Sequence, residues 1–413
     1  PTNDFDFTTN ATPEESIELL KKNNYKTTEV GKAFGTIELY DQERVVHITT
    51  FRKDTYETDS RNPEIEKASD LVTDLSRRDF TINSIAYSLE ANELIDPFSG
   101  LKDLASGTIS TPDDPIISFS DDPLRMLRVC RFASTHGFSP DNETYIAMKE
   151  NIERIKIITK ERIRDEINKL LVGKSPSMGI RTLVESGLSL YIIPEINELK
   201  IEVDPKHHHK DVYEHTLAVL DGVPPKLTLR MGALLHDIAK PNTKGIENGK
   251  VHFRHHEVVG ARMTKKILKG LKYDNKTIED IALLVEQHLR PHTFKMGWTD
   301  SAVRRYIVDA GHMLEDLNEL VRADVTTKNK IKAKEIYENL DEMEKRIEEV
   351  KAKEELSKIR PALSGDEIME HFNIQPGPKV GVIMKALYEQ RINDGEVSKE
   401  DALKLAEETY KNL

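Results

Sequence analysis

Residues 3–9 read NDFDFTT, and this stretch decides how the beginning of the chain folds. Carboxylates alternate with aromatic rings, and a period of two is typical of a β-strand with one apolar face. Side chains two positions apart on a strand share a face, so we expect Asp4 and Asp6 to project together. Phe5 and Phe7 would pack behind them. Two carboxylates on one face suit Mg²⁺; the alternative is an edge strand with two solvated aspartates.

The sequence that follows predicts mixed α and β structure that gives way to helices. Residues 36–40 and 44–51 are rich in β-formers and are separated by a polar turn. A helix is expected after Thr12, which can cap it, with Pro13 at its first position. After about residue 120 apolar residues recur at helical spacing, and we expect no further strands. The predicted fold class is therefore α+β, with a small mixed α/β head followed by mostly α-helical parts.

Composition limits the classes of protein to which the chain can belong. It has 413 residues, a formal net charge of −12 and a single cysteine. No run approaches the ~18 apolar residues of a transmembrane helix, and one cysteine excludes a disulfide framework. With no signal peptide at its start, we expect a cytoplasmic protein. The acidic balance argues mildly against a nucleic-acid partner, but the excess lies towards the ends. Residues 1–110 hold 12 basic and 21 acidic residues, whereas residues 181–340 hold 25 and 23.

Three further strings follow the Asp pair in order. They are RRDFTINS at 77–84, DPFSGLKDL at 96–104 and DDPLRMLR at 121–128. With these strings the chain resembles, through nearly its whole length, the class II tRNA nucleotidyltransferases, which include CCA-adding enzymes and bacterial poly(A) polymerases. The resemblance implies a nucleotidyltransferase head of the DNA polymerase beta superfamily. It also implies that Asp4 and Asp6 are the catalytic pair and bind Mg²⁺.

The resemblance assigns nucleotide binding to residues of two strings. A carboxylate at Asp79 accepts from the ribose 2′-hydroxyl, while a guanidinium reaches phosphate. For Arg77 and Arg78 the alternative is a pair of surface residues. For Arg128 and Arg131 the alternative is a solvated helix face. In the string at 96–104, a hinge and a purely structural turn are equally good interpretations of Asp96, Gly100 and Asp103. The residues carried over as nucleotide-binding are Arg77, Arg78, Asp79, Asn83, Asp122, Arg125, Arg128 and Arg131.

Asp122 and Arg125 are the pair to which the family assigns selection of the base. We expect both on one helix, where a spacing of three places them on a shared face. Their acceptors and donors would then hydrogen-bond the Watson–Crick edge of cytosine or adenine, in place of a nucleic-acid template. The alternative is an intrahelical salt bridge, worth only about 0.2–0.5 kcal/mol. Asp121 stands where the family commonly has Glu.

Two departures from the family pattern bear on the head. A Gly-rich phosphate-binding segment normally precedes the Asp pair, and we expect it upstream of residue 1, so that the head is N-terminally incomplete. His47 occupies a strand position where the superfamily often has a third carboxylate; a plain strand histidine is the default interpretation. Between Phe51 and Arg77, a polar segment with Asp59 corresponds to the family's flexible loop. Its presence argues against CC addition alone.

Ten of the fourteen histidines lie within residues 207–292. Their spacing resembles that of the HD-domain metal phosphohydrolases, a helical fold. The resemblance implies a site for a divalent transition metal or Mg²⁺, which activates water for phosphoester hydrolysis. The alternative is an HD scaffold that only supports tRNA. No role is assigned to the histidines at 207–209, 252, 255 and 292. The matching ligands are His215, His236, Asp237, His256, His288 and Asp324.

We therefore expect four parts. These are a nucleotidyltransferase head at 1–115, a helical neck for base recognition at 116–180, a helical body with the HD domain at 181–335 and a tRNA-binding tail at 336–413. The run at 328–358 is expected to be a solvated linking helix. The predicted reaction adds CCA, or its terminal A, to tRNA from CTP and ATP and releases pyrophosphate. The alternatives are a poly(A) polymerase, an HD phosphohydrolase with an inactive head, and a non-catalytic tRNA-binding protein. The oligomeric state is left open.

Overall fold

The computed structural model describes residues 4–28, 31–41, 44–55, 64–201, 211–248, 250–327, 329–353 and 360–413. The chain forms two compact units. One comprises Pro1–Glu198 with Gly270–Tyr273, and the other comprises Leu199–Lys269 with Asp274–Leu413. Among the described residues, no helix is both long and apolar enough to cross a membrane. The expected division into four parts stays a prediction.

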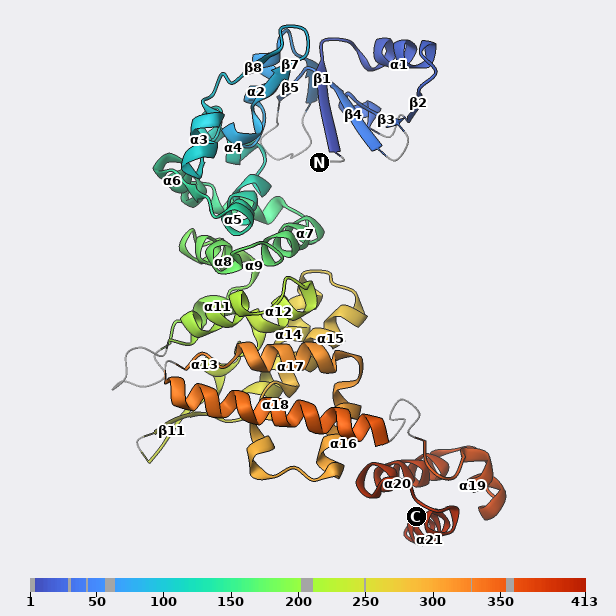
Figure 1. Cartoon of the computed structure of the whole chain (residues 1–413). Helices are drawn as coiled ribbons and strands as arrows, with labels where there is room; N and C mark the ends of the chain where they lie inside the picture. The colour runs from blue at the N-terminus through green and yellow to red at the C-terminus, as the bar shows by residue number, and fades with distance from the viewer. Residues whose placement is uncertain are drawn as a thin grey trace. The chain divides into compact units, whose positions relative to one another are not determined.

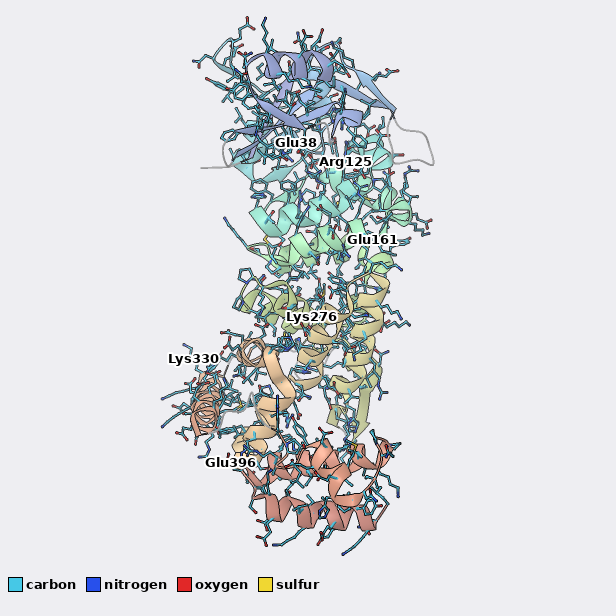
Figure 2. The ribbon with its side chains drawn as sticks, turned by 90° about the vertical axis from the view of Figure 1, so that its right-hand side faces the viewer. Glu38, Arg125, Glu161, Lys276, Lys330 and Glu396 are labelled. Atoms are coloured by element: carbon cyan, nitrogen blue, oxygen red, sulfur yellow. The ribbon has the colours of Figure 1, made fainter. Side chains whose placement is uncertain are left out.

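The head is built on a four-stranded sheet of order β1-β4-β3-β2 (Figure 1). The edge strand β1 pairs in parallel with β4, while β3 runs antiparallel to both β4 and β2. The predicted strands at 36–40 and 44–51 are thereby confirmed. Glu38 marks β3 in Figure 2. The strand bounds are β1 (Asp4–Thr9), β2 (Lys26–Thr28), β3 (Thr36–Asp41) and β4 (Arg44–Thr50).

Helix α1 (Pro13–Lys22) follows β1 and begins as predicted. The Thr12 hydroxyl accepts from the Glu15 backbone N–H, and the Glu15 carboxylate accepts from the Thr12 N–H, which completes a capping box. The helix buries Ile17. The expectation that Phe5 and Phe7 pack behind the sheet is met only in part, because they remain 37% and 41% exposed.

The rest of the head joins the sheet to the first helices of the neck. Gly100 begins α3, and a Cβ there would lie 2.1 Å from the Thr81 carbonyl oxygen, so only glycine fits. Asp96 accepts from the Gly100 N–H, and Asp103 accepts from the Thr81 hydroxyl. The elements are η1 (Lys32–Phe34), β5 (Arg52–Thr55), β6 (Glu64–Lys67), α2 (Leu71–Ser76), η2 (Thr81–Asn83), β7 (Ala86–Ser88), β8 (Glu93–Ile95), α3 (Gly100–Ser106) and β9 (Thr108–Ile109).

Helices dominate the remainder of this unit, and α5 is central because it packs on both α7 and α8. Its apolar residues recur every three or four positions, and they are buried, as the spacing predicts. The helix ends at Gly137, which adopts φ = 74°, a conformation that favours glycine. The elements are α4 (Pro115–Asp121), α5 (Leu124–His136), β10 (Ser139–Pro140), α6 (Asn142–Glu150), η3 (Ile152–Ile157), α7 (Lys160–Leu171), α8 (Pro176–Glu185), α9 (Ser189–Ile192) and α10 (Glu195–Glu198).

The second unit is mostly helical, and α12 contacts each of α11, α15 and α17. The prediction that strands end near residue 120 is wrong. Besides β10, an antiparallel hairpin of β11 and β12 lies between two histidine-containing segments. The elements are α11 (Val212–Gly222), α12 (Leu227–Leu235), α13 (Lys240–Thr243), β11 (Lys244–Glu247), β12 (Lys250–Phe253), α14 (His256–Gly270), α15 (Asn275–Gln287), η4 (Arg290–Met296), α16 (Asp300–Ala310), η5 (Gly311–Met313) and α17 (Leu314–Ala323).

Helix α18 (Lys330–Lys353) confirms the predicted charged helix but not its full solvation. Leu340, Met343, Ile347 and Val350 are buried, and their spacing of three to four places them on one face. This face packs against α16 and η4. The charged sequence concealed the stripe because four apolar residues spread over eleven positions barely alter its composition.

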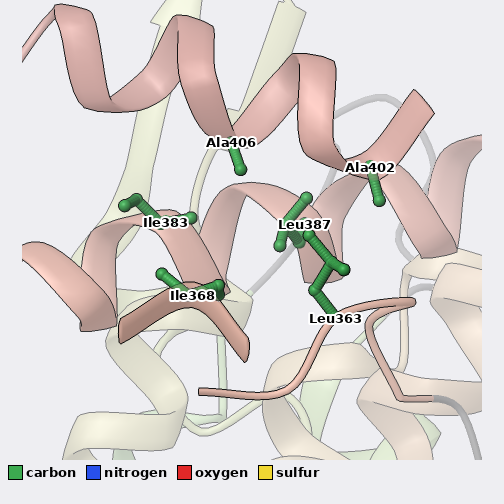
Figure 3. Close-up of a cluster of buried hydrophobic side chains, with 6 residues drawn as sticks. All are labelled: Leu363, Ile368, Ile383, Leu387, Ala402 and Ala406. Atoms are coloured by element: carbon green, nitrogen blue, oxygen red, sulfur yellow. The ribbon is translucent and has the colours of Figure 1, made fainter. Parts of the chain in front are cut away.

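The tail consists of α19 (Gly365–Phe372), α20 (Pro378–Asp394) and α21 (Lys399–Lys411). These helices enclose a small core of their own (Figure 3). Ser364 begins α19 with a capping box, and Pro378 occupies the first turn of α20. The core residues are Leu363, Ile368, Ile383, Leu387, Ala402 and Ala406.

Neighbouring residues of α20 provide a matched test of this core. Ile383 is fully buried, whereas Val382 is 45% exposed. Replacing Ile383 with Ala removes buried methyl groups and leaves a cavity, so the opening free energy of the tail should fall by about 2–5 kcal/mol. Val382→Ala should change it by at most about 0.5 kcal/mol. Hydrogen exchange of the α20 amides measures both values, and equal effects would contradict the packing described.

Candidate nucleotide and metal sites

The strand β1 carries the predicted catalytic pair. Asp4 pairs through its backbone with Val45, and its side chain lies outside the described residues. Asp6 lies directly across from His47, which in turn lies across from Glu38 of β3. Directly paired residues share a face of a sheet, so imidazole and two carboxylates follow one another across three strands. Among the described residues these three side chains do not form a group whose ligand atoms are close enough to hold a metal ion, and the Glu38 carboxylate accepts from the hydroxyls of Thr28 and Tyr40.

Arg77 lies just after α2, where three of its donor groups meet carboxylates. Its Nε and Nη2 donate to Asp74 Oδ1 at 3.0 and 2.8 Å, and its Nη1 lies 3.4 Å from Asp54 Oδ2. A guanidinium has five N–H donors, so two remain for a ligand. Asp74 and Asp54 were not among the predicted site residues. The signal for Asp74 was its spacing of three from Arg77 at the end of a helix.

Asp79 is buried and is linked to two other predicted residues. Asn83 Nδ2 donates to its Oδ1 at 3.0 Å, and Arg128 Nη2 of α5 lies 2.6 Å from its Oδ2. Arg78 Nη1 donates to the Asn83 carbonyl oxygen. The structure therefore brings Asn83 and Arg128 to the Asp79 carboxylate, while Arg78 contacts the backbone of Asn83.

The expectation that Asp122 and Arg125 share a helix face is wrong. Asp122 lies between α4 and α5 with φ = −129° and ψ = 94°, because a residue before proline avoids the helical region and Pro123 follows it. Its Oδ1 accepts from the Leu124 N–H at 3.1 Å, and Arg162 lies 3.7 Å from its Oδ2. The sequence spacing alone did not reveal this break between two helices.

Arg125 lies on α5 (Figure 2), and its guanidinium has other partners. Nη1 donates to Ser118 Oγ at 2.7 Å, and Nη2 donates to the Arg77 carbonyl oxygen at 2.5 Å. Arg125 therefore joins the helix that follows α4 to the segment that carries Arg77 and Arg78, which are predicted to bind the nucleotide.

A cavity of about 180 Å³ lies at this junction. Small-molecule sites typically enclose about 300–1,000 Å³, so this cavity is smaller than a usual ligand site, and of the predicted nucleotide-binding residues Arg77 and Arg125 line it. Burial raises the pKa of the Asp121 carboxyl, and Arg125 only partly opposes this rise. The residues that line the cavity include Asp54, Ser76, Arg77, Ser118, Asp121 and Arg125.

Arg131 lies on α5 beyond this group. Its Nε lies 3.4 Å from Glu166 Oε2 of α7, and burial lowers the pKa of its guanidinium. Its ion pair joins two helices of the neck. The expected basic face formed by Arg128 and Arg131 is thus used largely for pairing with Asp79 and Glu166.

The second unit brings all six predicted HD residues together. Two sets of three ligand atoms form, and the atoms of each set lie within 4.8 Å of one another. One set is His215, His236 and Asp324; the other is Asp237, His256 and His288. His236 and His288 follow the last residues of α12 and α15, and Asp324 follows α17. Helix C-termini carry partial negative charge and favour cations.

Three of the histidine rings are oriented by the same hydrogen bond to the backbone. In His236, His256 and His288, Nδ1 lies 2.7 Å from the backbone carbonyl oxygen three residues earlier. A carbonyl only accepts, so Nδ1 carries a proton in each ring, and in His256 and His288 the second nitrogen, Nε2, has no hydrogen-bond partner. This orientation of the second nitrogen is typical of metal-binding histidine. His215 instead contacts Thr326 Oγ1 through Nδ1 at 2.7 Å.

Asp237 lies between the two sets. Its Oδ2 lies 3.2 Å from His236 Nε2, and its Oδ1 lies 3.3 Å from His256 Nε2. Lys240 Nζ also contacts Oδ2, at 2.5 Å. One carboxylate oxygen therefore faces each set, and the oxygen that faces His236 is also paired with the Lys240 ammonium.

The charges of the site favour a cation. Burial acts to raise the pKa of Asp237, but His236 and further donors outweigh it and hold that pKa well below its ordinary value. Burial acts to lower the pKa of His236, and the carboxylates of Asp237 and Asp324 reverse the effect and raise it. Burial and nearby His236 lower the pKa of His288 to about 3, so this ring is neutral. Ionised carboxylates and a neutral imidazole are the forms that bind metal.

Orphaned polar atoms provide a further test of fit to a metal. Asp237 Oδ1, His256 Nε2 and His288 Nε2 are buried without a hydrogen-bond partner. Such atoms cost free energy unless something pairs with them. All three belong to one set and converge, so a divalent cation fits these residues.

The structure adds His292, which the sequence left without a role. Its Nε2 lies 3.3 Å from Asp324 Oδ2, the oxygen not used by His215. Lys240 is a second residue that sequence reasoning missed. Its spacing of three from Asp237 was the available signal. His252 and His255 belong to neither set, and the histidines at 207–209 lie outside the described residues.

Comparison with known proteins adds independent observations. Three family models match the chain: the poly A polymerase head domain at residues 1–110, the probable RNA and SrmB-binding site of polymerase A at 137–200, and the HD domain at 207–344. An A-adding tRNA nucleotidyltransferase of Deinococcus radiodurans is 32% identical over 335 residues, which cover 78% of this chain and 75% of the relative. The chain belongs to the tRNA nucleotidyltransferase and poly(A) polymerase family.

Other members of the family agree with this assignment. A CCA-adding enzyme of a Geobacillus species is 29% identical, over 95% of this chain and 85% of the relative. The crystal structure of the Bacillus stearothermophilus CCA-adding enzyme in complex with CTP aligns with a TM-score of 0.68, over 100% of this chain and 90% of that one. At 23% identity this likeness concerns the fold. The chain is thus a nucleotidyltransferase with a head, helical parts and an HD domain, as the sequence predicted.

Adjacent histidines allow a direct test of the HD site. His256 presents Nε2 to Asp237, whereas His255 is exposed and belongs to neither set. His256→Ala should lower the affinity for Mn²⁺ or Ni²⁺ by at least about tenfold, since even partners of ligands contribute that much. His255→Asn is the control, because asparagine tolerates the φ of 63° found there. Calorimetric titration measures both, and equal affinities would contradict the site.

Proposed function

We propose that the protein adds nucleotides of the CCA end to tRNA, with CTP and ATP as substrates and pyrophosphate as product. The observation that carries the proposal is the cavity lined by Arg77 of the head and Arg125 of the neck. It lies in the same unit as the strand with Asp4 and Asp6. Relatives named as A-adding and CCA-adding enzymes support the reaction class.

The catalytic residues proposed are Asp4 and Asp6, which would hold Mg²⁺. When bound, this ion lowers the pKa of the attacking 3′-hydroxyl and neutralises charge on the departing pyrophosphate. The two free N–H donors of Arg77 are available to phosphate oxygens. Asp79, oriented by Asn83 and Arg128, offers carboxylate oxygens to the ribose 2′-hydroxyl.

We propose that Asp122 and Arg125 select the base. They do not share a helix face, because Asp122 lies before α5 and Arg125 lies on it. Arg125 donates to Ser118 and to the Arg77 carbonyl oxygen, which fixes its guanidinium at the cavity. Asp122 is fixed by the Leu124 N–H. Cytosine and adenine both present an amino donor beside a ring acceptor, so a carboxylate and a guanidinium together complement them and reject guanine and uracil.

The number and kind of nucleotides added form the finer part of the proposal. Relatives of similar identity are named for A addition, for CC addition and for CCA addition. The loop that was expected to argue against CC addition alone includes residues 56–63, which lie outside the described residues. We propose CCA or terminal A addition, and we retain a cytoplasmic location as an expectation.

The test is extension of a tRNA that ends before CCA and of one that ends in CC. We expect incorporation of C and then a single A when both nucleotides are supplied, or only A on the CC-ending tRNA. Asp6→Asn should reduce incorporation by about 10²-fold or more, because several kcal/mol of metal-derived stabilisation are lost. Long runs of A without dependence on CTP would establish a poly(A) polymerase instead.

A second activity is supported by the HD residues. Two sets of ligands joined by Asp237 are suited to activating water against a phosphoester. We propose hydrolysis of 2′,3′-cyclic or 2′-phosphates at this site, with a divalent transition metal or Mg²⁺ held by the six residues.

The two activities are expected to be separable because their residues belong to different units. Asp237→Ala should abolish hydrolysis of a 2′,3′-cyclic nucleotide and leave nucleotide incorporation near the wild-type rate. Asp6→Asn should have the opposite effect. Hydrolysis that persists at the wild-type rate in Asp237→Ala would exclude the HD residues as its source.

A further inference from the structure

Asp74 is a fully buried carboxylate in the head, and the predicted reaction chemistry gives it no role. It lies on α2, three residues before Arg77. A buried charge is tolerated only when donors surround it. The donors around Asp74 come from three separate parts of the head.

Each oxygen of Asp74 has its own partners. Oδ1 accepts from Arg77 Nε and Nη2 and from the Arg52 backbone N–H at 3.2 Å. Oδ2 accepts from the Thr8 hydroxyl at 3.2 Å and lies 3.7 Å from Arg78 Nη2. A carboxylate has about four lone-pair sites, so these contacts use nearly all its capacity and fix one orientation.

Two of these partners lead to the nucleotide site. Thr8 lies on β1, two and four residues after the proposed metal ligands Asp6 and Asp4, and alternation places all three on one face. Arg77 has its side chain fixed by Asp74 and Asp54, while its carbonyl oxygen accepts from Arg125. Asp74 therefore lies between the strand of the catalytic pair and both arginines that line the cavity.

We propose that Asp74 is a positioning residue for nucleotide addition. It fixes the guanidinium of Arg77 relative to β1, and thereby sets the distance between the triphosphate contacts and the catalytic carboxylates. The inference rests on the proposed function, because Arg77 is taken to contact the nucleotide. The Thr8 hydroxyl on β1 donates to Asp74, and so does the guanidinium of Arg77, which is proposed to contact the nucleotide.

The variant that tests this role is Asp74→Asn, which keeps the size but turns one acceptor into a donor facing a guanidinium. We expect kcat/KM for both CTP and ATP to fall by about 10²-fold, as a misplacement of about 1 Å can cause. KM should rise, because Arg77 no longer holds its place. Wild-type incorporation tests the proposed function itself; only the ratio of variant to wild type tests Asp74.

A double-mutant cycle separates positioning from simple loss of stability. If Asp74 acts through Arg77, the double variant Asp74→Asn with Arg77→Gln should be no worse than Arg77→Gln alone. The control is Asp141→Ala, which removes the N-cap of α6 in the same unit and lowers stability without changing KM. Thr8→Val removes one partner of Asp74 on the surface of the strand and should shift KM in the same direction by a smaller factor.

Three results would overturn the proposal. One is a loss of activity in Asp74→Asn that matches its loss of folded protein in thermal unfolding, with KM unchanged. Another is multiplication of the two single-variant factors in the double variant. The third applies if Asp74→Asn does not fold, and it is a wild-type KM for both nucleotides in Thr8→Val.

Discussion

A buried carboxylate must be surrounded by donors or cations, and both units of this protein are organised by that requirement. Asp74 in the head draws the backbone of Arg52, the hydroxyl of Thr8 and the guanidinium of Arg77 to one point. Asp237 in the body draws histidines from different helices and Lys240. Desolvation of an unpaired ion costs several kcal/mol, so neither arrangement can relax without exposing or neutralising its charge.

The two carboxylates differ in what completes them. The oxygens of Asp74 are used by protein donors, so it has little capacity left for a ligand and is suited to fixing its neighbours. Asp237 Oδ1 has no hydrogen-bond partner, and it lies beside two histidine nitrogens that also have none. The partners of Asp74 are therefore all groups of the protein, whereas the unpaired atoms around Asp237 are suited to binding a cation.

The net charge of −12 does not show how many charges are free to bind a partner, because many of them are paired within the fold. Much of the acid lies in the head, where carboxylates bind arginines or are proposed to bind Mg²⁺. Arg128 and Arg131 looked available to RNA, yet they pair with Asp79 and Glu166. Net charge describes solubility and steering, and it does not reveal which charges are already paired inside the fold.

Elements and residues with local signals could be predicted from the amino-acid sequence. The capping box at Thr12 and the strand alternation of residues 4–9 could be predicted because each depends on local spacing. The six HD residues, which the structure brings into two sets, were predicted from the resemblance to HD-domain phosphohydrolases. Contacts between groups far apart in the sequence could be identified only in the folded chain. Pro123 separated Asp122 from the helix of Arg125, and Thr8 reached Asp74 from 66 residues away. Such contacts are set by packing between distant segments, and no local pattern encodes the partner.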